Sequence, residues 1–74
     1  MHYAERIREL REEREGPQTK VAQVLQVGQK TYSDYELGKT RIPVESLLIL
    51  ARMYDVSMDY ISGASDVRWT YPKK

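Results

Sequence analysis

The sequence contains no cysteine and only one histidine, His2. Disulfide bridges and thiolate metal sites are therefore excluded, and a single histidine at the second position supplies neither a zinc site nor a His-based catalytic triad. The longest apolar run covers only residues 47–51, whereas a membrane-spanning helix needs about 20 residues. The first residues are charged and do not look like a secretory signal peptide. We therefore expect a cytoplasmic protein that binds no metal and no cofactor and does not enter a membrane.

Features that accompany catalysis are also missing. The four glycines are isolated from one another, so the chain has no glycine-rich loop that could hold a phosphate. The carboxylates fall on segments rich in arginine, a pattern that is typical of solvated ion pairs. We predict that the chain is not an enzyme, and no small-molecule substrate is evident.

The length of 74 residues allows one small domain, and a hydrophobic content of 41% suits a globular fold. The net charge is +1, but positive charge is in excess within residues 16–43, which hold four lysines and arginines and two carboxylates. A strong polyanion-binding domain usually has a pI above about 9. This chain has a pI of about 8.0, so charge alone gives only weak support for a nucleic-acid partner.

Apolar residues recur at helical spacing in five segments, of which the first carries Tyr3, Ile7 and Leu10 on one face. The charged residues of this segment are expected to form solvated pairs, Glu5 with Arg8 and Arg6 with Glu9. The pattern predicts helices over residues 3–15, 17–25, 29–37, 44–54 and 58–62. These helices form one all-α domain, residues 1–63.

The remaining residues, 64–74, form a C-terminal tail. Val67, Trp69 and Tyr71 alternate there with polar residues, as in a short strand. A mobile terminus and an ordered, dimerising arm are both open at this point.

Residues 18–38 have the organisation of a helix-turn-helix. A helix is followed by a three-residue break and a second helix, and the small Ala22 stands where a crossing helix must approach closely. Val27 places an apolar side chain inside the break, and Tyr32 and Tyr35 share the inner face of the second helix. This arrangement can hold two helices steeply crossed.

On these residues the sequence resembles the Cro/CI-type, or XRE-type, helix-turn-helix family of phage and bacterial repressors. The resemblance covers residues 4–63 and is carried by residues 6–11, Gln18, Val21, Ala22, Leu25, Val27, Thr31, Ser33, Tyr35, Glu36, Gly38, Lys39, Ile42, Pro43, Leu47, Leu50, Ala51, residues 56–61 and Gly63. It implies a compact, five-helix, lambda-repressor-like DNA-binding domain in which the second and third helices form the helix-turn-helix.

The sequence departs from the family pattern at a few positions. Gln26 stands where glycine is usual, which predicts either backbone strain or a different turn. Pro17 and Gly28 replace the usual polar caps of the second and third helices, and Leu37 stands where asparagine is common. We expect these departures to affect the turn but not the fold.

The resemblance implies that the third helix lies in the major groove of DNA. The matching base-contacting positions are Gln29, Lys30, Ser33 and Asp34, and the matching phosphate-contacting positions are Gln18, Thr19, Lys39, Thr40 and Arg41. Arg11 and Glu36 match a pair that forms an internal salt bridge in the family. For the base and phosphate positions, an ordinary solvated surface is the alternative interpretation.

We therefore predict a sequence-specific, DNA-binding transcriptional regulator, most simply a repressor, that binds a pseudo-palindromic operator as a homodimer. Its two recognition helices would lie about 34 Å apart. The candidate dimer residues are Met58, Tyr60, Ile61, Trp69 and Tyr71. The alternative is a protein-interaction adaptor or antitoxin that keeps this fold and binds a partner protein through its aromatic tail.

Overall fold

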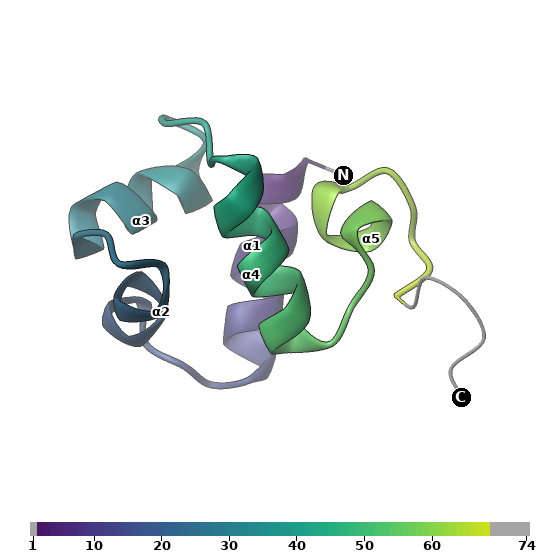
Figure 1. Cartoon of the computed structure of the whole chain (residues 1–74), viewed down its shortest axis with the longest axis horizontal. Coiled ribbons are helices and arrows are strands. Elements are labelled where there is room, and N and C mark those ends of the chain that lie inside the picture. The colour runs from purple at the N-terminus through teal and green to yellow at the C-terminus, as the bar shows by residue number, and fades with distance from the viewer. Residues whose placement is uncertain (1, 69–74) are drawn as a thin grey trace.

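The computed structural model describes residues 2–68, which fold into five α-helices without a strand (Figure 1). The helices are α1 (Tyr3–Glu13), α2 (Gln18–Leu25), α3 (Gln29–Leu37), α4 (Val44–Tyr54) and α5 (Met58–Ser62). The all-α prediction is confirmed, and α3, α4 and α5 have the predicted bounds. The first helix ends two residues earlier than expected, and α2 begins one residue later. Of the predicted strand, Val67 and Arg68 are irregular, and Trp69 and Tyr71 lie outside the described residues.

A single core joins the helices, with α1 and α4 in the centre, α2 and α3 on one side and α5 on the other (Figure 1). The largest fully buried side chains come from four of the five helices and are Ile7, Leu10, Tyr32, Leu50 and Ile61. Because Tyr32 comes from α3, the helix-turn-helix is held by the same core as the rest of the domain. Within residues 2–68, no helix has the length and apolar character needed to cross a bilayer.

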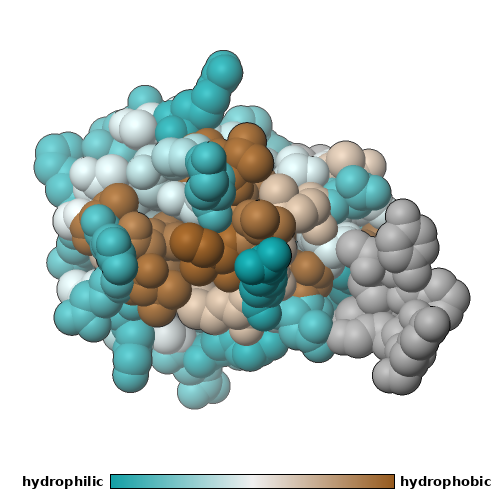
Figure 2. Space-filling model, viewed as in Figure 1, coloured by the Kyte–Doolittle hydropathy of each residue, from teal (hydrophilic) through white to brown (hydrophobic). Residues whose placement is uncertain are grey.

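Some large apolar side chains stay at the surface. Figure 2 shows apolar side chains gathered over α2 and α4. The exposed large apolar residues of these two helices are Val24, Val44, Leu48, Ile49 and Met53. Helical spacing does not predict this surface, because each of these residues falls outside the inward-facing stripe of its helix.

All five helices end with the same backbone turn, in which one residue takes a left-handed conformation and two N–H groups bond back into the last turn of the helix. Gly38 and Gly63 take this conformation without a steric penalty. Glu15, Gln26 and Asp55 carry a β-carbon there. For Gln26, with φ 60° and ψ 41°, the left-handed turn of the family pattern is therefore kept, at the cost of backbone strain.

Replacing Gln26 by glycine is expected to raise the free energy of unfolding by about 1 kcal/mol, because glycine removes this strain. The matched control is Gln23→Gly, which places glycine inside α2 and is expected to lower the free energy of unfolding by about 1 kcal/mol. Urea denaturation of both variants measures the difference. A Gln26→Gly variant that is less stable than the parent would contradict the strained turn.

The burial and the partners of Arg6 differ from the prediction made from the sequence. Instead of forming a solvated pair with Glu9, it is only 2% exposed, and its guanidinium lies 3.9 Å from the centre of the Tyr60 ring. It also donates a hydrogen bond to the Asp66 carboxylate at 3.0 Å. Arg6 therefore links α1 to α5 and to the segment that follows α5. The other expected pair is also replaced, since Arg8 bonds to Glu12 at 3.2 Å.

The segment 64–68 folds back onto the helical body. The N–H and hydroxyl groups of Ser57 donate hydrogen bonds to the carbonyls of Arg68 and Val67, respectively. The Arg68 guanidinium lies 2.6 Å from the Glu13 carboxylate. The beginning of the C-terminal tail is thus packed against α1 and the start of α5. A domain boundary at residue 63 stays a prediction.

Candidate nucleic-acid interface

The turn between α2 and α3 is closed by backbone hydrogen bonds and by one apolar side chain. The N–H of Val27 donates to the carbonyl of Ala22 at 3.0 Å, and the half-buried Val27 side chain packs against the core. Ala22 itself is buried, so the two helices approach each other closely at this point. α3 is therefore held in a fixed orientation relative to α2.

α3 has an inner and an outer face. Tyr32, Tyr35 and Glu36 are buried on the inner face. The structure brings the four candidate base-contacting residues together on the outer face: Gln29 and Lys30 are exposed, and Ser33 and Asp34 are half-buried. The outer face thus presents an amide, an amine, a hydroxyl and a carboxylate, which can bond to the edges of bases.

Two of these groups already contact each other. The Lys30 amine lies 3.4 Å from the Asp34 carboxylate, one helical turn away. The Lys30 side chain is 88% exposed, so this pair is weak and water competes for it. The amine can therefore exchange the carboxylate for another acceptor at little cost.

Leu37 lies on the same outer face and is not among the predicted site residues. It follows Ser33 by four residues and Gln29 by eight, a spacing that keeps residues on one side of a helix. It is 59% exposed. This spacing is visible in the sequence, but hydrogen bonding to bases and phosphates predicts only polar site residues.

The loop after α3 carries the candidate phosphate-contacting residues Lys39, Thr40 and Arg41, all exposed. The N–H groups of Lys39 and Thr40 both donate to the Asp34 carbonyl, at 2.9 and 3.3 Å. At the other end of the loop, the N–H of Ile42 donates to the Tyr3 hydroxyl at 3.0 Å. The basic loop is thus anchored to α3 and to α1.

At the start of α2, the two candidate phosphate-contacting residues Gln18 and Thr19 differ in exposure. Thr19 is exposed. Gln18 is half-buried, and its side-chain amide donates to the Glu36 carboxylate at 3.1 Å. The helix has no side-chain cap and no acidic residue in its first turn, so its first N–H groups have no side-chain partner from this helix. This end can attract an anion.

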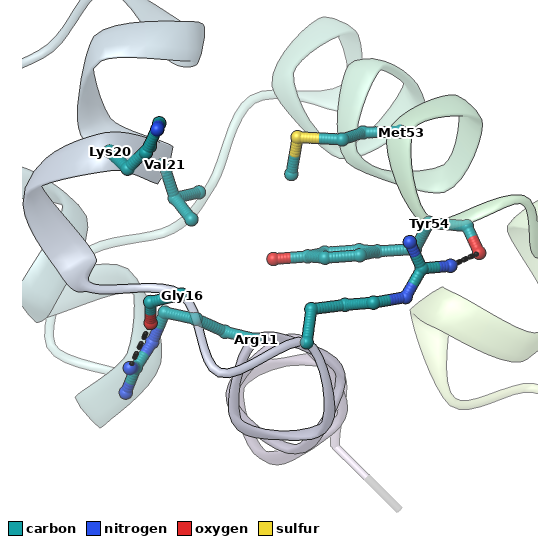
Figure 3. A pocket seen from close by; sticks show the side chains of 7 residues that line it. Arg11, Gly16, Lys20, Val21, Met53 and Tyr54 are labelled. Atoms are coloured by element: carbon teal, nitrogen blue, oxygen red, sulfur yellow. Dashed lines mark hydrogen bonds between the residues drawn. The ribbon is translucent and has the colours of Figure 1, made fainter.

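Arg11 and Glu36 form a two-pronged ion pair inside the domain, with Nε–Oε2 and Nη2–Oε1 distances of 2.6 and 3.1 Å. The Glu36 side chain is 2% exposed. Burial alone would raise the pKa of Glu36, but the hydrogen bond from Arg11, together with the neighbouring Tyr32 and Gln18 side chains, outweighs it and holds that pKa below its ordinary value. Arg11 also donates to the Gly16 carbonyl at 3.0 Å (Figure 3). One guanidinium thus connects α1, the α1–α2 loop and α3.

A pocket of about 160 Å³ opens between the end of α1, α2 and the end of α4 (Figure 3). It is lined by Arg11, Arg14, Gly16, Lys20, Val21, Met53 and Tyr54. Burial raises the pKa of Tyr54 to about 12, so this phenol stays protonated near neutral pH. The lining contains no nucleophile paired with a base. Elsewhere in the described part of the chain, no cluster of three or more His, Asp or Glu side chains could hold a metal ion.

The expected dimer surface needs correction at two positions. Tyr60 and Ile61 are 7% and 0% exposed, since both pack into the core of their own domain. They are therefore not available to a second copy in this conformation. Met58 is half-buried, and Trp69 and Tyr71 lie outside residues 2–68.

Comparison with known proteins gives consistent relatives. The profile of the Helix-turn-helix family matches residues 7–61. The chain is 38% identical over 64 residues to the uncharacterised HTH-type transcriptional regulator YobD of Bacillus subtilis, covering 86% of this chain and 57% of the relative. It is 30% identical over 69 residues to the regulator AnsR of the same organism, covering 93% and 60%. The chain thus spans somewhat more than half the length of these curated relatives.

Two solved structures share the fold. A transcriptional regulator from Listeria innocua has a TM-score of 0.82 at 26% identity, covering 97% of this chain and 65% of that one. The DNA-binding domain of the P22 C2 repressor has a TM-score of 0.75 at 27% identity, covering 96% of both chains. These likenesses confirm the lambda-repressor-like five-helix fold. On the family match and these relatives, the chain belongs to the XRE-type helix-turn-helix family of transcriptional regulators.

Proposed function

We propose that the chain is a sequence-specific DNA-binding repressor that inserts α3 into the major groove of a pseudo-palindromic operator. The observation that carries this proposal is the division of α3 into two faces. Its inner face is buried in the core, and its outer face offers several different hydrogen-bonding groups to a partner. The fold shared with the DNA-binding domain of the P22 C2 repressor supports the DNA-binding part of this proposal.

Each polar group of the outer face suits a base edge. Gln29 can bond to N6 and N7 of adenine in a bidentate manner, and Lys30 can donate to O6 and N7 of guanine. Asp34 can accept from N4 of cytosine, and it repels phosphate, which favours specificity over affinity. Ser33 can bond to a base or to a phosphate.

Phosphates would be bound on both sides of α3. On one side lies the start of α2, where Thr19 is exposed and Gln18 is held through its bond to Glu36. On the other side lies the anchored basic loop with Lys39, Thr40 and Arg41. Contacts of this kind set the position of the domain on DNA and most of its affinity, without reading sequence.

A homodimer is part of the proposal. A single small helix-turn-helix domain contacts too few bases for tight specificity, and two copies related by a two-fold axis would read two half-sites. Since Tyr60 and Ile61 are buried, the contact between copies would involve other residues.

Two substitutions separate base reading from phosphate binding. Lys30→Ala is expected to relax the base preference at one position of each half-site. Arg41→Ala is expected to weaken binding to all sequences alike and to lower the salt slope of log K by about 1 per protomer. Titration of labelled duplexes at several salt concentrations measures both effects. If neither substitution changes the activity of the protein, a protein-interaction adaptor explains the chain better than a DNA-binding regulator.

A further inference from the structure

Leu37 is an apolar residue on the otherwise polar outer face of α3. It is 59% exposed, while the residues that hold α3 in place, Tyr32, Tyr35 and Glu36, are buried on the other face. Leu37 therefore contributes little to the core. Its helical phase places it between Ser33 and Lys30 when the helix is viewed along its axis, within the face assigned to DNA.

The backbone around Leu37 is fixed. Gly38 takes the left-handed conformation with φ 75° and ends the helix. The next N–H, that of Lys39, donates to the Asp34 carbonyl at 2.9 Å, which locks the last turn of α3. The phosphate-binding loop begins directly after this turn. A domain held on DNA by that loop would carry Leu37 close to the groove.

We propose that Leu37 reads the C5-methyl group of a thymine at one edge of each half-site. This inference rests on the proposed DNA-binding function. The thymine methyl is the apolar group among the base edges of the major groove, and a leucine side chain can contact it without leaving a polar group unpaired. Leucine cannot bond to a phosphate, which sets this position apart from the polar residues around it.

The pattern of the whole outer face supports this assignment. Gln29, Lys30 and Asp34 have the chemistry to read adenine, guanine and cytosine, and Leu37 adds the partner for thymine. Leu37 lies eight residues after Gln29, or about 12 Å along the helix axis. Base pairs are about 3.4 Å apart. The thymine would thus lie within about three to four base pairs of the base contacted by Gln29, and closer if α3 is inclined to the DNA axis.

The test removes the methyl group and the leucine separately. An operator selected by the parent protein from random duplex DNA is resynthesised with uracil in place of each thymine in turn, and affinities are measured for the parent and for Leu37→Ala. The parent is expected to lose about three- to tenfold in affinity at one symmetry-related pair of thymines. Leu37→Ala is expected to show no loss at that pair, since the methyl no longer has a partner.

The matched control is Val44→Ala, which shortens an apolar side chain that is 70% exposed but lies outside α3. This control should keep the uracil sensitivity of the parent. Equal sensitivity in the parent and in Leu37→Ala overturns the role of Leu37 and leaves the proposed function standing. If no uracil substitution lowers the affinity of the parent, the proposed role of Leu37 is also overturned. If the parent selects no sequence at all, the proposed function and this inference both fall.

Discussion

Truncating either partner of the buried Arg11–Glu36 pair is expected to lower the free energy of unfolding by about 3–5 kcal/mol. Arg11→Ala would leave the Glu36 carboxylate, whose side chain is 2% exposed, without its guanidinium partner. The total stability of a small domain is about 5–15 kcal/mol, so much of it would be lost. Urea denaturation followed by circular dichroism measures the change.

Two controls show whether burial is the cause. Arg8→Ala breaks the Arg8–Glu12 pair, whose side chains are 59% and 54% exposed, and should change the stability by less than about 0.5 kcal/mol. The double variant Arg11→Met with Glu36→Leu leaves neither charge unpaired and should recover much of the loss. Equal effects of Arg11→Ala and Arg8→Ala would contradict the account of the pair.

The same pair makes stability depend on pH. Because the pKa of Glu36 is lower in the folded than in the unfolded protein, its contribution is fully present above the unfolded pKa of about 4.3. The contribution is lost as the pH falls through the lower, folded pKa. Denaturation midpoints measured from pH 7 to pH 2 should therefore fall more steeply for the parent than for the Arg11→Met, Glu36→Leu double variant. Parallel profiles would contradict this.

For DNA binding, the largest expected effect of a single substitution comes from Gln29→Ala. Gln29 is exposed at the start of α3, and its side chain makes no hydrogen bond within residues 2–68, so its amide is available to a base. Loss of a bidentate contact with adenine is expected to cost about 1–3 kcal/mol per half-site, or roughly 5- to 150-fold in affinity. The cost should disappear on duplexes in which that base pair is already changed.

Gln23→Ala is the matched control, because Gln23 is also an exposed glutamine but lies on α2. It should leave affinity for the selected operator within about twofold of the parent, as expected for a surface substitution that removes no contact. Titrations of both variants against the operator and against a changed operator make the comparison. Similar losses of affinity for Gln29→Ala and Gln23→Ala would contradict the proposal that α3 reads the bases.

Much of the fold could be predicted because the signals that end helices are local. Gly38 and Gly63 mark the ends of α3 and α5, and Ser57 caps the start of α5 through a bond to the N–H of Tyr60. Arg6 could not be placed in this way. Its partner Asp66 lies 60 residues away, whereas helical spacing considers only neighbours one turn apart.

The candidate site was predictable to a similar extent. Spacing alone places the four polar residues on one face of α3, but it does not show that Gln18 is bonded to Glu36, a contact between two helices. The apolar residues of α5 show a second limit of prediction from sequence, which concerns what an apolar face packs against. Tyr60 and Ile61 have the pattern of an amphipathic helix, and the pattern is the same whether that face packs on its own core or on a second copy.

The measurement that tests the central claim most directly is selection from a pool of random duplex DNA, sequenced after binding at two salt concentrations. A dimeric, sequence-specific regulator is expected to enrich an inverted repeat whose half-sites are centred about one helical turn apart. The enriched sequence should persist at the higher salt concentration, although affinity falls. Weak binding that disappears with salt and enriches no sequence would contradict the claim, since phosphate attraction alone would then explain it.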